Sequence, residues 1–422
     1  MGKLKYLAII VLVALLCSGR AVASQESKVG EELELEAEGA FLLDVDSDKI
    51  LYTKNPDKPL YPASTTKIMT ALLLLEHAPL DEIIVVGEEI DRIGADSSTA
   101  DLEVGDRLTV AEMVYALMLP SGNDAAYTTA VHIGRKISGF EFLDIDQAVE
   151  AFVELMNRRA RELGALNTNF VVPDGYHTPD HISTARDLAL ITLEACRNEF
   201  ICQVVSSPEY HWQGERWGNT NRLLQQDYPN AYYPWATGFK TGYTPQAGHC
   251  LISTASGGGR ELLAVILKST GEERWQDMRR LLEYGFKAWQ NYSMLVEGRQ
   301  IFLVPITGQR QGQGDMMKVL AGDTFSGLFH VQEIERMELN FDWARGVADT
   351  RDGLALRAPI REGQALGMAV VSLDGEVLAE VEMIAAWGVK GNLGLPLFGG
   401  GVMLLVLVSI YIWLRKKRQA AA

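Results

Sequence analysis

The C-terminal end of the chain places the strongest constraint on its architecture. Residues 396–414 are apolar and uncharged, and four basic residues, Arg415-Lys416-Lys417-Arg418, follow at once. A helix of this length rises about 28 Å, enough to cross the hydrocarbon core of a bilayer. Because basic clusters stay on the cytoplasmic side, residues 415–422 are predicted to be a cytoplasmic tail and the body to lie outside the membrane. An amphipathic surface helix is the alternative, but residues 402–414 show no polar face.

The N-terminus predicts export of that body. Two lysines precede an apolar run that is short for a membrane span, and Ala21-Val22-Ala23 supplies the small residues of a signal-peptidase site. Residues 1–23 are therefore predicted to be a signal peptide, cleaved before Ser24. Two alternatives stay open: a lipoprotein signal that uses Cys17, and an uncleaved N-terminal anchor.

The charge of the chain excludes one class of partner. Asp and Glu number 55 against 39 Lys and Arg, which gives a net charge of −16. Several of the basic residues lie in the two terminal segments, so the exported body is still more acidic. An acidic body repels phosphate backbones, and nucleic-acid binding is therefore not expected.

The cysteines and histidines do not predict a metal site or a disulfide framework. Cys196, Cys202 and Cys250 are odd in number and lack metal-ligand spacing, so free thiols are expected, with a Cys196–Cys202 pair as the alternative. His177 and His181 have the spacing of a helical metal pair, but the proline between them predicts a loop and no metal.

The exported body is predicted to contain three parts. Residues 24–38 are acidic and polar, which predicts a loose leader. Residues 39–292 alternate helical and strand patterns and form the larger domain. Residues 293–390 contain short β-rich runs separated by turn residues, which predicts a small separate β domain. A chain of 422 residues is long enough for two or three domains.

The residue patterns also predict individual elements. A capping sequence at Thr184 predicts a helix that reaches about Arg197, and Gly257-Gly258-Gly259 predicts a hairpin turn. The other expected helices cover 64–76, 108–119, 125–137, 152–163 and 274–289. The expected strands cover 40–45, 50–52, 239–242, 250–255 and 262–267, and in the β domain 300–304, 318–320, 335–339, 368–372 and 377–384.

The first chemically informative segment is Ser64-Thr65-Thr66-Lys67, at the start of an apolar helix. Residues three apart on a helix share a face, so the amine of Lys67 is expected within reach of the hydroxyl of Ser64. Unpaired N–H groups at a helix N-terminus can also stabilise an oxyanion. The plain alternative is a capping serine and a surface lysine, but a lysine in an otherwise apolar helix needs a reason to be there.

Two further segments are informative only in combination. Ser121-Gly122-Asn123 lies between two predicted helices and, taken alone, is a plain loop of turn residues. Lys240-Thr241-Gly242 lies on a predicted strand, where its lysine and threonine would ordinarily be surface residues. The glycine lets another group approach the backbone closely.

The order Ser-x-x-Lys, Ser-x-Asn, Lys-Thr-Gly in an exported chain is typical of penicillin-binding proteins and serine β-lactamases. The sequence resembles the D-alanyl-D-alanine carboxypeptidases, which are low-molecular-mass penicillin-binding proteins of bacterial peptidoglycan. The resemblance covers about residues 38–290. It is carried by Pro62-Ala63-Ser64-Thr65-Thr66-Lys67-Ile68-Met69-Thr70, by residues 118–126, by Ser183-Thr184-Ala185-Arg186-Asp187-Leu188-Ala189, and by residues 238–248.

The resemblance implies an α+β fold: an antiparallel sheet flanked by helices, as in the penicillin-binding and serine β-lactamase enzymes. Residues 39–292 would be the catalytic domain, followed by a β domain that acts as a stalk and by the membrane helix at 396–414. The implied activity removes the terminal D-Ala from peptidoglycan stem peptides during cell-wall remodelling. Neither a metal nor another cofactor is implied, and β-lactams are implied as inhibitors because they mimic D-Ala-D-Ala.

The resemblance also implies the roles of individual residues. Ser64 attacks the peptide carbonyl and forms an acyl-enzyme, with Lys67 as the base. Burial and the charge of Lys240 would lower the pKa of Lys67. Asp187 falls in a shared segment too, where a helix-capping role and a catalytic role both stay open. Ser121 would relay a proton, and Asn123 would hold the substrate amide. Lys240 and Thr241, beside Gly242, would bind the carboxylate of the substrate. The N–H groups of Ser64 and Tyr243 would form the oxyanion hole.

Four other functions are weighed against this one. A class A β-lactamase uses a glutamate for deacylation; Glu194 has the spacing to Asn198, but the usual leucine is absent. A D,D-endopeptidase of the same fold is closer. A catalytically silent peptidoglycan-binding protein would not need every motif residue, yet all of them are present. A structural surface protein is supported only by the leader and the β domain.

Overall fold

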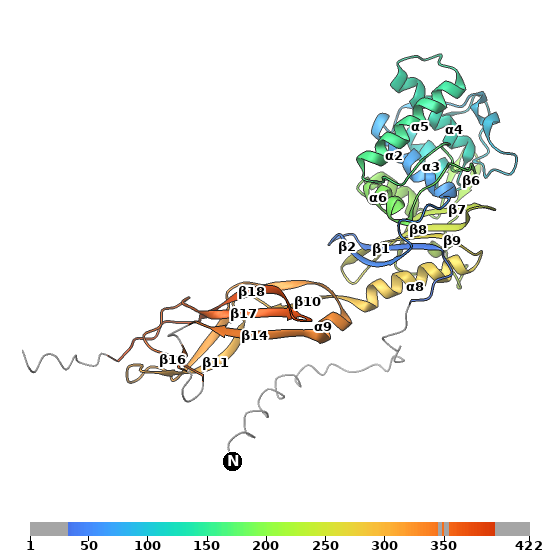
Figure 1. Cartoon of the computed structure of the whole chain (residues 1–422). Coiled ribbons are helices and arrows are strands. Elements are labelled where there is room, and N and C mark those ends of the chain that lie inside the picture. Colours follow the sequence, from blue (N-terminus) through green and yellow to red (C-terminus); the bar gives the residue numbers. More distant parts are fainter. Residues whose placement is uncertain (1–32, 345–347, 350–353, 393–422) are drawn as a thin grey trace, which may run out of the picture.

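The computed structural model describes residues 33–344, 348–349 and 354–392. The predicted signal peptide, residues 24–32 of the leader, the span at 396–414 and the tail at 415–422 lie outside these ranges. Among the described residues, no helix is long and apolar enough to cross a membrane. Figure 1 shows a head in which helices surround a sheet, and an elongated body of strands that extends from it.

The head is built on a five-stranded sheet with the order β2-β1-β9-β8-β7, in which all neighbouring strands are antiparallel. The sequence predicts the β1–β2 and β8–β9 hairpins correctly, because each has a short turn between two apolar runs. The outer edge of β7 has no strand partner in the described structure. The strands are β1 (Gly39–Asp44), β2 (Lys49–Lys54), β7 (Ala236–Thr244), β8 (Gly248–Gly257) and β9 (Arg260–Ser269).

Helices cover both faces of this sheet (Figure 1). One face packs on α8 (Glu273–Ala288), whose Trp275, Met278 and Leu282 share a core cluster with Leu42 and Ile266 of the sheet. The opposite face packs on a larger, mostly helical cluster. Its helices are α2 (Lys67–His77), α3 (Val110–Met118), α4 (Asn123–Ser138), α5 (Ile145–Glu162), α6 (Ala185–Cys196) and α7 (Glu199–Ser206). The expected antiparallel sheet flanked by helices is confirmed.

Side-chain caps account for the differences from the predicted helix ends. α5 begins earlier than residue 152, because Asp144 caps it by accepting a hydrogen bond from the N–H of Asp146 at 2.9 Å. A short helix that Asn198 caps, α7, was not predicted from the sequence. Short elements complete the head: β3 (Ile83–Val85), β4 (Arg107–Thr109), β5 (Glu209–Trp212), β6 (Glu215–Gly218), and the 3-10 turns η1 (Ala63–Thr66), η2 (Glu88–Arg92) and η3 (Arg222–Leu224).

The C-terminal body has its own apolar core, which includes Val304, Met317, Leu366 and Met383. Its main sheet has the order β14-β17-β18-β12-β11-β16-β15, and β10 pairs with β13 in a separate ribbon. The expected strand at 335 begins only at Met337, because a helical turn precedes it. The elements are β10 (Trp289–Leu295), β11 (Gln300–Thr307), β12 (Met316–Ala321), β13 (Phe325–His330), α9 (Val331–Arg336), β14 (Met337–Trp343), β15 (Ala348–Asp349), β16 (Ala355–Arg357), β17 (Ala365–Leu373) and β18 (Glu376–Ala385).

The junction between the two bodies is packed. α8 ends at Ala288 and β10 starts at the next residue, so this strand crosses the predicted domain boundary at residue 293. Trp289 and Leu328 belong to the core cluster of the head. Lys49 of the head donates a hydrogen bond to the carbonyl of Leu328 at 2.7 Å, and its Nζ lies 4.8 Å from the ring centre of Trp289. The connection is therefore a continuation of the core.

Candidate active site

The side chains of Ser64 and Lys67 meet at the start of α2. Ser64 lies on the 3-10 turn η1, and Lys67 is the first residue of α2, so the predicted helix begins with a tighter turn than an α-helix. The Lys67 Nζ lies 3.2 Å from the Ser64 Oγ. Ser64 is partly accessible, whereas Lys67 is fully buried. A solvent-reachable hydroxyl thus contacts a buried amine.

The other contacts of Lys67 determine how its protons are used. Its Nζ donates to Asn123 Oδ1 at 2.6 Å and to the carbonyl oxygen of Asp174 at 2.9 Å. A neutral amine has two N–H groups and one lone pair, so with both N–H groups committed the lone pair faces the Ser64 hydroxyl. This arrangement suits a base that accepts the serine proton.

The pKa of Lys67 favours that neutral form. Burial lowers the pKa to about 8, although the carboxylates of Asp174 and Asp124 act in the opposite direction. Burial is the leading cause of the shift. An amine with a pKa near neutrality is substantially unprotonated under mildly alkaline conditions and still basic enough to accept a proton.

Lys240 provides a second buried amine on β7. Its side chain is 1% exposed, and its Nζ donates one long hydrogen bond of 3.3 Å to the carbonyl of Thr241. Among the described residues, no carboxylate forms an ion pair with it. Burial, and then the charge of Lys67, lower the pKa of Lys240 well below its ordinary value. A buried amine without a counter-ion is suited to bind an anionic group of a substrate, because the anion stabilises its charged form.

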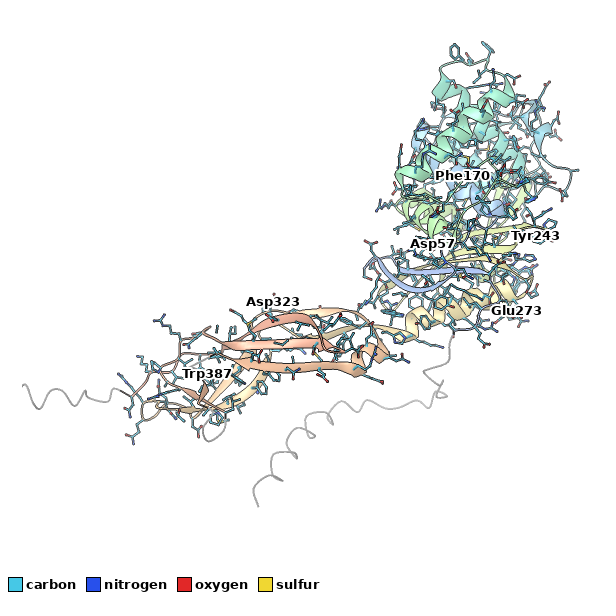
Figure 2. All side chains as sticks on the ribbon, in the orientation of Figure 1. Asp57, Phe170, Tyr243, Glu273, Asp323 and Trp387 are labelled. Carbon is cyan, nitrogen blue, oxygen red and sulfur yellow. The ribbon has the colours of Figure 1, made fainter. Side chains whose placement is uncertain are left out.

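Gly242 lets β7 approach Ser64. A Cβ built on Gly242 would lie 3.1 Å from the backbone nitrogen of Ser64 and 3.0 Å from the carbonyl oxygen of Pro62. A side chain here would push the strand away from η1. The next residue, Tyr243, is exposed and stacks on His249 with ring centres 4.4 Å apart; Figure 2 shows it at the margin of the head.

The α3–α4 loop brings Ser121 to the same place in a strained conformation. Ser121 has φ +67°, which is uncommon for a residue with a side chain. Its hydroxyl is buried and has no hydrogen-bond partner in the described structure. The surrounding contacts hold this geometry: Ser98 Oγ donates to the Ser121 carbonyl at 2.7 Å, and Asn123 Nδ2 donates to Ser97 Oγ at 2.8 Å. The free hydroxyl is available to a bound ligand.

Thr241 is held by a residue that was not predicted from the sequence. Its Oγ1 lies 2.7 Å from the Oγ1 of Thr220, and the N–H of Thr220 donates to the carbonyl of Leu119 at 3.2 Å. Thr220 therefore links β7 to the end of α3. No local sequence pattern marks it.

The loop at residues 171–178 is the main part of the site that the sequence did not indicate. Gly175 has φ +84°, and a Cβ there would lie 1.9 Å from the carbonyl oxygen of Ala63. Only glycine fits this contact. Asp174 is 1% exposed; its Oδ1 accepts from the N–H of Tyr176 at 3.0 Å, while its Oδ2 has no partner. The Pro173-Asp174-Gly175 sequence signals a turn, but not its packing against η1.

Asp124 supports the loop that precedes α3. Its carboxylate accepts hydrogen bonds from the N–H of Ala100, at 3.0 Å to each oxygen, and from the N–H of Leu102 at 3.1 Å. It lies next to Asn123 at the start of α4, so it fixes the chain near Ser97 and Ser98. No sequence pattern singled it out.

His181 supports the η1 turn through both of its ring nitrogens. Its Nδ1 accepts from the N–H of Val171 at 2.9 Å, so its Nε2 carries the hydrogen and donates to Thr66 Oγ1 at 2.8 Å. Burial lowers the pKa of His181 to about 3, which keeps it neutral. Among the described residues, no cluster of three His, Cys, Asp or Glu side chains is arranged to hold a metal ion.

The remaining residues considered from the sequence have structural contacts. The N–H of Asp187 donates to Thr184 Oγ1 at 3.0 Å, so Thr184 caps α6. The Oδ2 of Asp187 accepts from the N–H of Asn167 at 2.7 Å and fixes a loop. Glu194 pairs with Arg159 at 2.8 Å and with Arg197 at 2.6 Å. Cys196, Cys202 and Cys250 are free thiols, as expected.

Comparison with known proteins identifies the family. The family model described as D-alanyl-D-alanine carboxypeptidase matches residues 24–271. The D-alanyl-D-alanine carboxypeptidase DacF of Bacillus subtilis is 31% identical over 92% of this chain and 95% of its own length, and DacC of Escherichia coli is 28% identical over 91% and 90%.

Solved structures agree with this assignment. Penicillin binding protein 5 of Haemophilus influenzae superposes with a TM-score of 0.58 at 27% identity, covering 85% of this chain and 98% of that one. A Streptomyces DD-transpeptidase superposes with a TM-score of 0.55 at 33% identity, covering 60% and 98%. The chain, with its Ser-Lys pair beside a Lys-Thr-Gly strand, belongs to the D-alanyl-D-alanine carboxypeptidase family.

Proposed function

We propose that this D-alanyl-D-alanine carboxypeptidase acts through an acyl-enzyme on Ser64 and removes the terminal D-Ala from peptidoglycan stem peptides. The observation that carries the proposal is the contact of the Lys67 amine with the Ser64 hydroxyl, while both amine hydrogens are held by Asn123 and by the Asp174 carbonyl. A serine is a weak nucleophile unless a neighbouring base accepts its proton.

Substrate binding follows from the charges and free groups around Ser64. The terminal carboxylate of D-Ala-D-Ala binds Lys240 and the hydroxyl of Thr241, because the buried Lys240 amine has no counter-ion in the described structure and an adjacent anion stabilises its charged form. The stem peptide lies along the free edge of β7. The oxyanion forms beside the N–H groups of Ser64 and Tyr243, next to the close approach at Gly242.

The reaction then needs a chain of proton transfers. Lys67 accepts the Ser64 proton as the oxygen attacks the carbonyl carbon between the two D-Ala residues. Lys67 then gives this proton to the hydroxyl of Ser121, which has no partner in the described structure and passes its own proton to the leaving amine. Free D-Ala departs, and Lys67 is neutral again. A water molecule, activated by the same amine, hydrolyses the ester on Ser64 and restores the enzyme. β-Lactams acylate the same oxygen. Unlike the peptide, they release no D-Ala, so no space opens for the water that would hydrolyse the ester.

We also propose the placement of the enzyme and the extent of its domains. A signal peptide at 1–23 and a span at 396–414 would hold the catalytic domain (39–292) and the β domain (293–390) at the outer face of the cytoplasmic membrane. The acidic leader would follow the signal peptide, and residues 415–422 would remain in the cytoplasm. Both predictions rest on the sequence of the two ends.

Two measurements on the purified chain test the activity. Incubation with benzylpenicillin should add one penicilloyl group, which peptide mapping by mass spectrometry should locate on Ser64. A soluble peptide that ends in D-Ala-D-Ala should release D-Ala. Rapid penicillin turnover without a lasting adduct would instead indicate a β-lactamase. Cleavage of crosslinked dimers without release of D-Ala from monomers would indicate an endopeptidase.

The rate of acylation should rise with pH and level off above about pH 8. Only neutral Lys67 can accept the serine proton, and its pKa is about 8. Below that value the neutral fraction falls about tenfold for each pH unit, and the rate constant should fall with it. Second-order rate constants for a chromogenic cephalosporin, measured from about pH 6 to about pH 10, would give the midpoint. A rate that is independent of pH over this range would contradict the role of Lys67.

Replacing Asp174 with Asn should move that midpoint to lower pH. The carboxylate of Asp174 raises the pKa of Lys67, so its removal should lower the midpoint by roughly one unit. The carbonyl that holds Lys67 belongs to the backbone and is retained. Asp96→Asn is the control, because Asp96 is exposed and contacts the same loop through Tyr176. An unchanged midpoint in Asp174→Asn would mean that Asp174 is protonated in the folded enzyme.

A further inference from the structure

A cavity lies away from Ser64, at the opposite end of β7. It has a volume of about 320 Å³ and lies between the tip of the β8–β9 hairpin, the end of α8 and the start of β10. Trp235 precedes β7, and at about 3.3 Å per residue it lies roughly 23 Å along the strand from Gly242. The lining includes Trp235, Gly258, Phe286, Trp289, Gln290 and Asn291.

The indole of Trp235 is exposed and held in one orientation. It is 46% exposed, which is unusual for so large an apolar side chain. A Cβ on Gly257 would lie 3.0 Å from its ring, so this glycine lets the hairpin lie directly against the indole. The Phe286 ring meets it edge to face with centres 4.9 Å apart. These contacts fix the ring before any ligand arrives.

Polar groups beside the indole can make neutral hydrogen bonds. Gln290 and Asn291 are exposed and adjacent, and each amide offers donors and acceptors. Trp289 is buried, and its indole N–H has no partner in the described structure. A Cβ added to Gly258 would have no other atom within 4 Å, so a ligand can approach the backbone there.

The charge of the cavity argues against an anionic ligand. Arg260 is the charged residue of the lining, and its guanidinium is already satisfied. It pairs with Asp44 at 2.9 Å and donates to the carbonyls of Trp289 and Gly285 at 2.5 Å and 2.7 Å. A neutral ligand with one apolar face and many hydroxyl or amide groups is complementary to this surface. Pyranose sugars that carry N-acetyl groups have those properties.

We propose that this cavity binds the N-acetylated glycan strand of peptidoglycan. The inference rests on the proposed function, because the stem peptides that enter the cleft are attached to such strands. Another strand of the same polymer can occupy the cavity while a stem lies in the cleft, which would raise the local concentration of stems near Ser64.

The test titrates the full chain with the hexamer of N-acetylglucosamine by calorimetry, in a detergent without a sugar headgroup. Saturable binding is expected, and Trp235→Ala should weaken it about tenfold or more. Trp387→Ala is the matched control, because Trp387 is 37% exposed and lies on the C-terminal body (Figure 2). The paired change Gln290→Ala with Asn291→Ala should also weaken binding, so the test does not depend on the folding of one variant.

Activity provides the second readout. Trp235→Ala should release D-Ala from a soluble peptide at the wild-type rate. On glycan-linked stems it should show a KM raised several-fold with kcat unchanged. Absence of hexamer binding by the wild type, or equal binding by Trp235→Ala, would overturn the proposal. If the wild type instead bound the hexamer but released no D-Ala from the soluble peptide, the proposed activity would fail while the glycan site stood.

Discussion

Ser64→Ala should abolish both D-Ala release and penicillin binding, with kcat/KM falling about ten-thousand-fold or more. The change removes the only oxygen that can form the acyl-enzyme, and the groups that bind substrate cannot replace it. Ser64 is partly exposed and Lys67 keeps its bonds to Asn123 and Asp174, so the fold should be unaffected. Steady-state assays of D-Ala release and intact-mass measurement with benzylpenicillin would report the two losses separately.

The matched control for this variant is Ser206→Ala. Ser206 is exposed at the end of α7, and its hydroxyl donates to the carbonyl of Gln203 at 3.0 Å. It should retain full activity and form the penicilloyl adduct. If Ser64→Ala still acquired the adduct, another nucleophile would have to carry the reaction, and the assignment of Ser64 would be wrong.

Lys67→Met should reduce the acylation rate by about a hundred- to ten-thousand-fold and should also lower stability moderately. Methionine has a similar shape, but it cannot accept the Ser64 proton. It also leaves the buried Asn123 Oδ1 and the Asp174 carbonyl without their donor, so the melting temperature should fall, although burial disfavours the charged form of the lost amine. Thermal unfolding and stopped-flow acylation, measured on the same sample, would separate the two effects.

A surface lysine provides the comparison for Lys67. Lys287→Met removes an exposed ammonium that pairs with Glu283 at 2.8 Å on α8. Exposed pairs of this kind contribute little, so neither activity nor stability should change appreciably. A Lys67→Met enzyme that acylated at the wild-type rate would show that another group, such as the Ser121 hydroxyl, starts the proton transfer.

The predictable part of the site is the part set by local sequence. Ser64 and Lys67 are three residues apart, so any helical turn brings them together. The loop that carries Ser121 and Asn123 is bounded by two apolar helices that the periodicity identified. The hairpins of the head sheet could also be predicted from the sequence, because their turns lie within a few residues of both strands.

The unpredicted part depends on packing between distant segments. Asp174 and Gly175 reach Lys67 and Ala63 across more than a hundred residues of chain, and only the folded core brings them together. Thr220 reaches Thr241 in the same way. The pKa of Lys67 also could not be read from spacing, because its leading cause is burial by the surrounding helices and loops.

The packed junction between α8 and β10 has a mechanical consequence. Because strand follows helix without an intervening loop, and Lys49 ties the head to Leu328, the C-terminal body behaves as a strut and not as a tether. An enzyme on a flexible tether could reach any point of a hemisphere around its membrane anchor. With the proposed span at 396–414 as its anchor, such a strut would hold Ser64 within a thin shell at one height, so the enzyme would trim the layer of wall at that height and leave other layers untouched.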